Sequence, residues 1–319
     1  MWPHRPDSRG GLSRRAGLAV CAALALLPAT GCGQGAPKGD DDRPTTTASE
    51  GSAHRDAAFA RLERIHYAHL GLYAVDTGNG NQVTWNDTRR FSYNSTVKSF
   101  LAAAVLKKNR SDGDMDRVLH YDRSDLTANS PVSEKHVGTG MSRRALCDAA
   151  VRYSDNTAAN VLFEDIGGPG RLGTFLKTEL HDTVTRTDRV EPHLSRWSPG
   201  EQHDTSTARQ MASDLRELVL GRTLRTAERR QLTTWLRTNT TGDTTIRAGV
   251  PKGWKVGDKT GTGSYYAARD DIAVIWPPGR KPLVMAVLTY RDGAKNAEAD
   301  DKLPADAAKA AITALDTGR

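Results

Sequence analysis

The order of strand-like and helix-like segments constrains the fold of this chain more than any other feature. Apolar runs typical of strands occur at residues 69–75 and 82–85, and then again at 255–262, 271–276 and 283–290. Between them, from about residue 95 to 236, the apolar residues have mainly helical spacing. Strands near both ends and helices in between predict one sheet built from both termini, with a helical lobe inserted.

The predicted fold class is therefore α+β. We expect an antiparallel sheet of about five strands, flanked by helices at residues 57–66 and 294–315, with an inserted all-helical lobe. Gly78-Asn79-Gly80 predicts a tight turn between the first two strands. The α/β lobe is expected to comprise residues 53–87 and 240–319, and the helical lobe residues 88–239.

Residues 1–31 predict an export signal. A basic start that contains Arg14-Arg15 precedes an apolar run from Leu18 to Leu27, which is too short to span a bilayer. The arginine pair resembles a twin-arginine signal, although a plain basic start is the alternative. The following Ala29-Thr30-Gly31-Cys32 resembles a bacterial lipoprotein cleavage site, which predicts a lipid on Cys32. We expect an exported, extracytoplasmic protein, either lipid-anchored or secreted.

Residues 32–52 predict a disordered tether. They are rich in glycine, proline, threonine and serine and show no apolar periodicity, so they cannot bury enough surface to fold. Asp40-Asp41-Asp42 is more typical of a solvated linker than of a metal site. The folded catalytic domain is expected to span residues 53–319.

Composition excludes several classes of partner. The chain has 45 Lys and Arg against 38 Asp and Glu, but no basic run interleaved with aromatic residues, which argues against nucleic-acid binding. Cys147 is the one cysteine beyond the N-terminal region, and its apolar helical setting predicts a buried, unreactive thiol. Because no H-E-x-x-H or clustered histidines occur, we expect no metal and no cofactor. No interface stripe is evident, so a monomer is expected.

The first candidate for chemistry is the pair Ser95 and Lys98. Residues three apart on a helix lie on the same face, which brings an amine near a hydroxyl. Serine is a weak nucleophile until a base is placed beside it. A lysine in a dry pocket close to other cations can lose its proton and serve as that base. On its own this spacing is common, so the prediction depends on motifs later in the chain.

Two further motifs occur in a fixed order. Ser154-Asp155-Asn156 lies in a helical region, and Lys259-Thr260-Gly261 lies on a late strand. The series S-x-x-K, S-D-N and K-T-G resembles the serine β-lactamase and penicillin-binding-protein superfamily, most closely the class A β-lactamases. The resemblance covers nearly all of residues 53–319, including Asp188-Arg189-Val190-Glu191-Pro192 followed by Asp204-Thr205.

This resemblance implies catalytic roles for four residues. Ser95 would attack the β-lactam amide and form an acyl-enzyme, and its proton would pass to Lys98 or, through a water, to Glu191, a choice that is disputed for the family. Ser154 would relay a proton to the departing nitrogen. Glu191 would then activate the water that removes the acyl group. Backbone N–H groups of Ser95 and Thr262 would stabilise the oxyanion.

The resemblance also implies a substrate-binding set. Asn156 would bond the side-chain amide of the substrate, and Ser195 would help to seat the hydrolytic water. An ion pair of Arg189 with Asp204 would close the neck of the loop that carries Glu191. The substrate carboxylate would be held by the strand residues and a nearby arginine, namely Lys259, Thr260, Gly261, Thr262 and Arg269.

Four features of the chain depart from the family pattern. Ser195 stands where asparagine is frequent, which predicts altered deacylation. Asn129 stands where an aromatic residue often lines the pocket. The segment Ser264-Tyr265-Tyr266 is one residue longer than usual before Arg269. Asn94 and Gly263 exclude the disulfide that marks some carbapenem-hydrolysing relatives.

Three functions are compatible with these motifs. The first is a β-lactamase that hydrolyses penicillins and related antibiotics and gives resistance to them. The second is a D-alanyl-D-alanine peptidase of the same superfamily, against which the Glu191 loop argues. The third is a penicillin trap or sensor that acylates without turnover, which only the Ser195 departure favours.

Overall fold

The computed structural model describes residues 47–111, 113–293 and 295–317. The predicted signal, the first part of the predicted tether and Cys32 lie outside these residues. Among the described residues, no helix is both long and apolar enough to cross a membrane.

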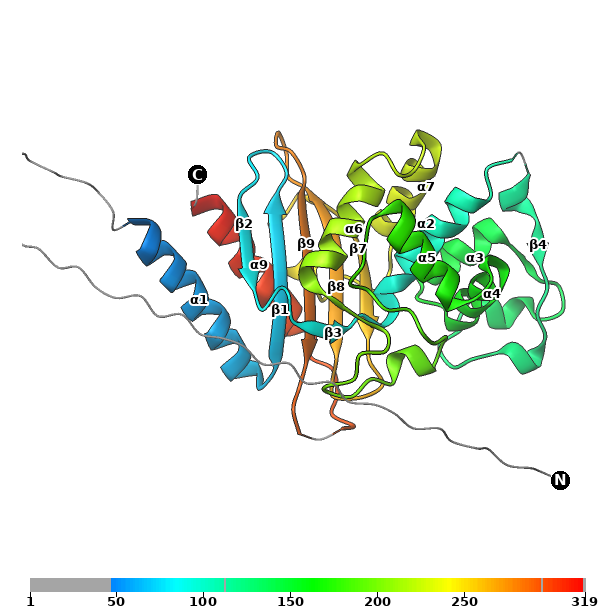
Figure 1. Cartoon of the computed structure of the whole chain (residues 1–319), viewed down its shortest axis with the longest axis horizontal. Coiled ribbons are helices and arrows are strands. Elements are labelled where there is room, and N and C mark those ends of the chain that lie inside the picture. The colour runs from blue at the N-terminus through cyan, green and yellow to red at the C-terminus, as the bar shows by residue number, and fades with distance from the viewer. Residues whose placement is uncertain (1–46, 112, 294, 318–319) are drawn as a thin grey trace, which may run out of the picture. The chain divides into compact units, whose positions relative to one another are not determined.

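A five-stranded antiparallel sheet forms the centre of the fold and confirms the predicted class (Figure 1). Its spatial order is β2-β1-β9-β8-β7, so an N-terminal strand pairs directly with the last one, with His69 opposite Tyr290. Both chain ends therefore build one sheet, as the sequence predicts. The strands are β1 (His69–Asp76), β2 (Gln82–Trp85), β7 (Lys255–Thr262), β8 (Arg269–Trp276) and β9 (Leu283–Tyr290).

Both faces of this sheet are buried, as the alternation along β9 demonstrates. Leu283, Met285 and Val287 belong to one hydrophobic cluster, whereas Val284, Ala286 and Leu288 belong to another. Successive side chains of a strand point to opposite faces, so a continuous apolar run supplies two cores at once.

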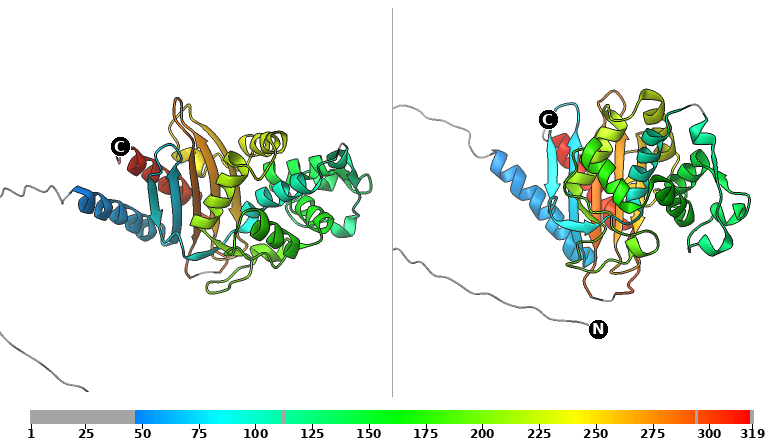
Figure 2. Two further views of the ribbon diagram at one scale, coloured as in Figure 1. Left: turned by 45° about the horizontal axis from the view of Figure 1, so that its top comes forward. Right: turned by 45° about the vertical axis from the view of Figure 1, so that its right-hand side comes forward.

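Helices from the two ends of the chain cover one face. Phe59 of α1 (Thr47–His66) and Leu315 of α9 (Lys302–Thr317) share a cluster with Leu72, and the short α8 (Ile246–Gly249) adds Ile246. On the other face, Leu215 of α6 (Ala208–Leu220) and Leu232 of α7 (Thr226–Arg237) join the second cluster. Figure 2 shows the ribbon of α6 on the opposite side of the sheet from α1 and α9.

The helical lobe is built around α2 (Lys98–Lys108). Its residues Lys98 to Leu106 are all buried, because α3 (Arg143–Arg152), α4 (Asn156–Ile166) and α5 (Pro169–Glu179) surround it. Two short pairs of strands complete the fold. They are β3 (Arg90–Ser92) with β6 (Thr205–Thr207) and β4 (Val118–Leu119) with β5 (Met141–Ser142).

Two helix starts differ from the sequence-based expectation. Helix α9 begins at Lys302 rather than at residue 294, because Pro304 fits the first turn of a helix but would break one that began ten residues earlier. The Asp300 carboxylate accepts a hydrogen bond from the Lys302 N–H at 2.9 Å and so caps this start. Helix α1 begins at Thr47 rather than at residue 57, so residues 47–52 of the predicted tether are part of it.

Candidate active site

Ser95 lies in a short 3-10 helix, Asn94–Val97, that leads into α2. The side chain is only 8% exposed, and its hydroxyl donates a hydrogen bond to Glu191 Oε1 at 3.2 Å. A hydroxyl that already donates to a carboxylate has the geometry of a nucleophile beside its base.

Lys98 is fully buried at the start of α2, close to Ser95. Its ammonium lies 3.1 Å from Glu191 Oε1 and donates to the Ser154 carbonyl at 2.9 Å and to the Asn156 Oδ1. Lys98 and Ser95 therefore meet the same carboxylate oxygen. The buried ammonium has three acceptors, which is what a charged group needs when it is removed from water.

Glu191 reaches this position from a long loop between α5 and β6. Its side chain is buried, and the Glu191–Pro192 peptide is cis. The Asn160 side chain of α4 holds the loop backbone on both sides of Glu191. Its Oδ1 accepts from the Glu191 N–H at 2.9 Å, and its Nδ2 donates to the Glu191 carbonyl at 2.9 Å. This clamp fixes the carboxylate beside Ser95.

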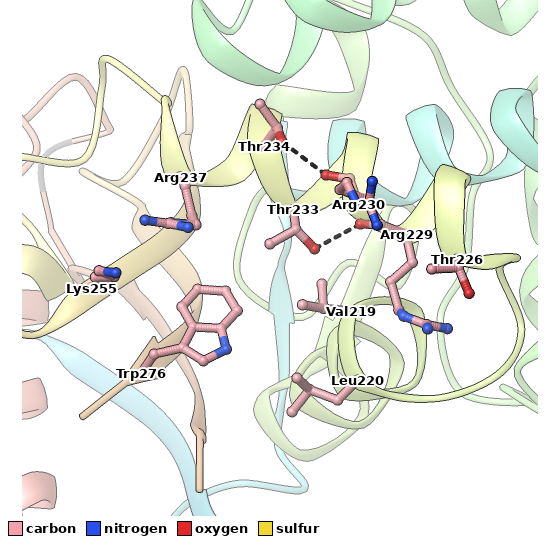
Figure 3. A pocket seen from close by; sticks show the side chains of 10 residues that line it. All are labelled: Val219, Leu220, Thr226, Arg229, Arg230, Thr233, Thr234, Arg237, Lys255 and Trp276. Atoms are coloured by element: carbon pink, nitrogen blue, oxygen red, sulfur yellow. Dashed lines mark hydrogen bonds between the residues drawn. The ribbon is translucent and has the colours of Figure 1, made fainter. Parts of the chain in front are cut away.

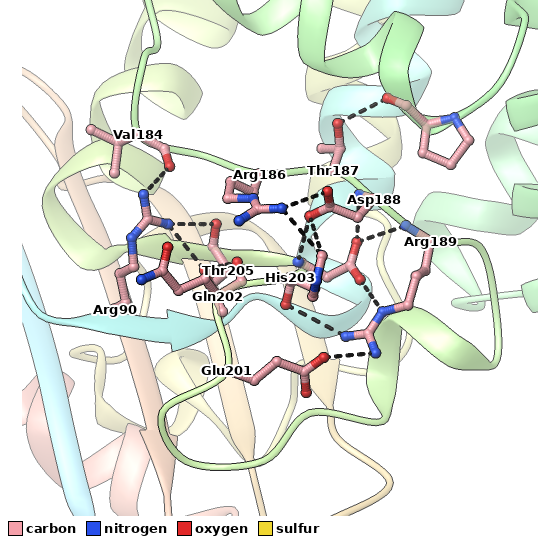
Figure 4. A network of polar contacts seen from close by, with 12 residues as sticks. Arg90, Val184, Arg186, Thr187, Asp188, Arg189, Glu201, Gln202, His203 and Thr205 are labelled. Atoms are coloured by element: carbon pink, nitrogen blue, oxygen red, sulfur yellow. Dashed lines mark hydrogen bonds and ion pairs between the residues drawn. The ribbon is translucent and has the colours of Figure 1, made fainter. Parts of the chain in front are cut away.

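The neck of the same loop is closed by charged groups (Figure 4). Arg189 Nε lies 2.5 Å from Asp204 Oδ2, and Arg189 also pairs with Glu201 at 2.9 Å. Asp204 is fully buried and accepts further hydrogen bonds from the Arg189 N–H, the Asp188 N–H and the Tyr93 hydroxyl. The four donors compensate the buried carboxylate and join the two ends of the loop.

Ser154 links the two lysines. Its carbonyl accepts from Lys98 and its hydroxyl accepts from Lys259 Nζ at 3.0 Å. Ser154 lies in the turn between α3 and α4 with φ of +57°, a left-handed conformation that is uncommon for serine. Asp155 starts α4 by accepting from the Ala158 N–H. The turn directs the Ser154 hydroxyl toward Lys259 of β7.

Lys259 is fully buried, and its pKa lies well below that of an ordinary lysine. Burial lowers the pKa of Lys259 to about 7, and the Lys98 cation contributes in the same direction. The carboxylates of Asp258 and Asp271 oppose this change. Lys259 is thus a cation that releases its proton near neutral pH, next to a serine hydroxyl.

The end of β7 and the start of β8 form a cationic side of the site. Arg269 Nη1 donates to the Thr262 hydroxyl at 2.8 Å, and Arg269 Nε lies 2.5 Å from Asp301. Thr260 shares a hydrogen bond with the Thr241 hydroxyl at 2.5 Å. Gly261 is required by close packing, because a Cβ there would lie 2.9 Å from the Tyr93 carbonyl oxygen.

Ser195, Asn129 and the segment before Arg269, which the sequence predicts to depart from the pattern of the resembled family, also lie here. The Ser195 hydroxyl donates to Glu191 Oε2 at 3.1 Å, and the Ser195 carbonyl accepts from the Ser264 N–H at 2.8 Å. Asn129 is exposed at the rim with φ of +61°. Tyr265 lines the pocket, and its ring centroid lies 3.9 Å from Lys295 Nζ.

These residues surround a cavity of about 800 Å³. Ser95, Ser154, Asn156, Glu191, Ser195, Thr260, Thr262 and Arg269 line it. Lys98, Lys259 and Gly261 lie behind its wall, in contact with lining residues. The structure therefore brings together the catalytic and substrate-binding residues expected from the sequence, whereas Arg189 and Asp204 lie at the loop neck and Cys32 lies outside the described residues.

A second cavity of about 510 Å³ lies between α6, α7 and the paired ends of β7 and β8 (Figure 3). Arg229, Arg230, Arg237 and Lys255 line it together with Trp276, but no serine, cysteine, histidine or carboxylate does. Its lining threonines therefore have no histidine or carboxylate beside them in the cavity that could activate a hydroxyl for acyl transfer. Among the described residues, no cluster of three or more His, Cys, Asp or Glu side chains could hold a metal ion. Cys147 is buried and free, and burial raises the pKa of its thiol.

Sequence reasoning did not assign two residues that the structure places at the site. Asn160 clamps the Glu191 backbone, and Asp301 pairs with Arg269. Asn160 lies four residues after Asn156, which puts both amides on one face of α4 and could have signalled its role. Asp301 precedes α9, and no local pattern connects it with β8.

Comparisons with known proteins agree with this geometry. A profile of the "Beta-lactamase enzyme family" matches residues 55–315. A beta-lactamase of Amycolatopsis lactamdurans is 52% identical over 257 residues, which cover 81% of this chain and 84% of that protein. A crystal structure of a beta-lactamase from Streptosporangium roseum superimposes with a TM-score of 0.80 at 44% identity, covering 83% of this chain and 99% of the other. A class A beta-lactamase from Clostridium kluyveri gives a TM-score of 0.80 at 41% identity, with 83% and 99% covered. This chain belongs to the class A β-lactamases.

Proposed function

We propose that this protein hydrolyses the amide bond of β-lactam antibiotics through a covalent acyl-enzyme on Ser95. The observation that carries the proposal is that Ser95 and Lys98 both contact one carboxylate oxygen, Glu191 Oε1, in the wall of the cavity of about 800 Å³. A nucleophile, a cation and a base in one buried cluster are what acyl transfer requires.

In the acylation step, Ser95 Oγ attacks the lactam carbonyl carbon. The direct hydrogen bond from Ser95 to Glu191 at 3.2 Å favours Glu191 as the acceptor of the serine proton. Lys98 stabilises the negative charge on that carboxylate and holds Ser154 through its carbonyl. The backbone N–H groups of Ser95 and Thr262 stabilise the oxyanion, a contribution of about 3–4 kcal/mol for each donor in comparable sites.

The lactam nitrogen needs a proton when its bond to carbon breaks. Ser154 is suited to deliver it, because its hydroxyl accepts from Lys259, which replaces the proton that Ser154 gives up. The pKa of Lys259, lowered to about 7, makes this transfer possible near neutral pH.

Deacylation requires a water activated by a carboxylate. Glu191 can take a proton again once it has released the Ser95 proton to solvent, from which Lys259 in turn regains the proton that it gave to Ser154. Ser195 donates to Glu191 Oε2 at 3.1 Å and so orients the carboxylate, and it can also bond the water. As the bond between Ser95 Oγ and the acyl group breaks, Glu191 passes the proton from the water to Ser95 Oγ, and the acid product leaves.

The substrate carboxylate would bind where Thr260, Thr262 and Arg269 line the cavity, with Lys259 behind them. Asn156 lines the same cavity. Its Oδ1 accepts from Lys98 and its Nδ2 donates to the Ala128 carbonyl, so the second N–H of Nδ2 would donate to the acylamino carbonyl of the substrate. Tyr265 supplies an aromatic ring to the pocket lining, whereas Asn129 supplies none.

The two alternative activities lack comparable support. The loop that carries Glu191 places a carboxylate base beside the acylated serine, which is the position needed to hydrolyse an acyl-enzyme. A trap would need a defect in deacylation, yet Ser195 contacts Glu191 and leaves the carboxylate in place. Hydrolysis with turnover, and hence antibiotic resistance in the host, is the function that this site supports best.

The direct test is hydrolysis of a penicillin, measured as the loss of the absorbance of its lactam ring. The wild-type chain should turn over many equivalents, whereas Ser95→Ala should be inactive. A D-alanyl-D-alanine peptide serves as the competing substrate. Release of D-alanine at a higher kcat/KM than penicillin hydrolysis would replace this proposal with the peptidase.

We also propose that residues 1–31 direct export and that Cys32 anchors the mature monomer to the membrane. Support comes from the arginine pair, the short apolar run and the small residues before Cys32. Cys32→Ala should move the protein from the membrane fraction to the medium. Release of the wild-type protein to the same extent would contradict the anchor, and export after Arg14→Lys with Arg15→Lys would contradict the twin-arginine route.

A further inference from the structure

Asn94 immediately precedes the nucleophile and has an unusual environment. It is fully buried and has φ of +47°, a left-handed conformation that asparagine tolerates better than most residues. Its amide nitrogen donates to Asp270 Oδ2 at 2.6 Å and to the Ser92 hydroxyl at 3.1 Å. The hydrogen bond to Asp270 therefore fixes the backbone next to Ser95 to strand β8.

Asp270 is a fully buried carboxylate on β8, away from the cavity surface. Its other oxygen accepts from the Thr289 N–H of β9 at 3.0 Å. Burial raises the pKa of Asp270 to about 7, while these two hydrogen bonds and the adjacent Arg269 cation oppose the rise. The carboxylate thus connects two sheet strands to the residue before Ser95.

The same pair packs against both neighbours of Thr262. A Cβ at Gly261 would lie 3.1 Å from Asn94 Cβ and 3.2 Å from Asp270 Oδ2. A Cβ at Gly263 would lie 3.3 Å from Asn94 Oδ1. Asn94 and Asp270 consequently occupy the space between the Ser95 backbone and the end of β7 that carries Thr262.

We propose that Asn94 and Asp270 are positioning residues, whose hydrogen bond fixes the backbone N–H of Ser95 relative to that of Thr262. This inference rests on the proposed function, in which these two N–H groups stabilise the oxyanion. Donors must lie about 2.7–3.1 Å from the developing charge to be effective, so the spacing between two separate chain segments has to be maintained. The pair maintains it with one charge-assisted hydrogen bond.

The test exchanges the donor and the acceptor. In Asp270→Asn, the introduced amide faces two donors, the Thr289 N–H and the Asn94 amide, so one contact is lost. In the double variant Asn94→Asp with Asp270→Asn, the carboxylate introduced at position 94 accepts and the amide introduced at position 270 donates. All contacts can then form again, and aspartate also tolerates the left-handed backbone.

The measurement is the acylation rate of each variant by rapid mixing and intact mass, expressed per titratable active site. We expect Asp270→Asn to lower the acylation rate by about tenfold or more, with little change in KM, because the oxyanion donors are misplaced. The double variant should recover most of the wild-type rate. Asp165→Asn is the matched control, because it removes another buried carboxylate, which pairs with Arg143 at 2.6 Å in the helical lobe. It should lower stability without changing acylation.

Three results would overturn the proposal. They are an unchanged acylation rate in Asp270→Asn, a double variant as slow as the single one, and an equal loss in the Asp165→Asn control. Failure of the proposed function looks different. In that case the wild-type chain itself forms no acyl-enzyme, and this inference falls with it.

Discussion

Lys98 Nζ and Glu191 Oε1 lie 3.1 Å apart, and both side chains are almost completely removed from water. A helix of the helical lobe supplies the lysine, whereas a loop much later in the chain supplies the glutamate. Each charge compensates the other, and Ser95 donates to the same carboxylate oxygen. The ion pair therefore holds the proposed base directly beside the proposed nucleophile, and changes to either member should affect catalysis more than binding.

Glu191→Gln should allow acylation to be observed as a stable product. The amide keeps the size of the side chain but cannot accept a proton, so deacylation should slow by about 10²–10⁴-fold, the usual contribution of a general base. Acylation should slow as well but still proceed, because Lys98, the other candidate base, lies close to Ser95 and can take the serine proton. Stopped-flow or mass measurements of acyl-enzyme decay check this. Decay at the wild-type rate would remove Glu191 from the deacylation step.

Ser195→Ala should slow deacylation selectively. The lost hydrogen bond to Glu191 Oε2 is one to a charged group, worth about 1.5 kcal/mol or more, which corresponds to about tenfold. Acylation should change much less. Ser195→Asn keeps a polar group of longer reach and should also alter the deacylation rate. If neither variant changed that rate, Ser195 would have no role in seating the water.

Substrate binding should weaken as the pH rises. The pKa of Lys259 is lowered to about 7, so its positive charge is present below that pH and is lost above it. KM for penicillins, which carry a carboxylate, should therefore increase as the pH is raised through this value. Lys259→Arg stays charged throughout this range and should give a flatter KM profile. A flat wild-type profile would contradict the role of Lys259 in binding the carboxylate.

At the neck of the loop that carries Glu191, Arg189 should contribute more to the free energy of unfolding than the nearby Arg186. Arg189→Ala leaves the buried Asp204 without its ion-pair partner and should cost about 2 kcal/mol of unfolding free energy. Arg186→Ala is the matched control, because its pair with Asp188 is largely exposed and should be worth less than about 1 kcal/mol. Urea unfolding measures both. Equal losses would mean that Asp204 does not depend on Arg189.

A buried carboxyl far from the cavity should make stability depend on pH. Burial and the neighbouring Asp182 raise the pKa of Asp214 to about 9, well above its value of 3.8 in an unfolded chain. Between these values the folded state binds more protons than the unfolded state, so the free energy of unfolding falls as the pH rises. Asp214→Asn removes this contribution, and its urea midpoint should decline less across that pH range. An unchanged slope would show that Asp214 does not stay protonated.

The sequence predicted the sheet, its composition from both termini, and the residues that gather around the cavity. It did so because strand periodicity and short catalytic motifs are local signals. It could not predict the start of α9, which depends on Asp300 and Pro304, nor the left-handed turn that aims Ser154 at Lys259. It also missed the contacts of Asn160, Asp301 and Asp270, because each joins segments far apart in the chain through side-chain orientation alone.

The measurement that tests the central claim most directly is the intact mass of the protein over time with excess penicillin. We predict hydrolysed penicillin in many-fold excess over protein, little lasting adduct on the wild-type chain, and a full one-to-one adduct on Ser95 in Glu191→Ala. A stable adduct on the wild-type protein without product would contradict turnover and indicate a trap. Neither adduct nor product would contradict the assignment of Ser95 as the nucleophile.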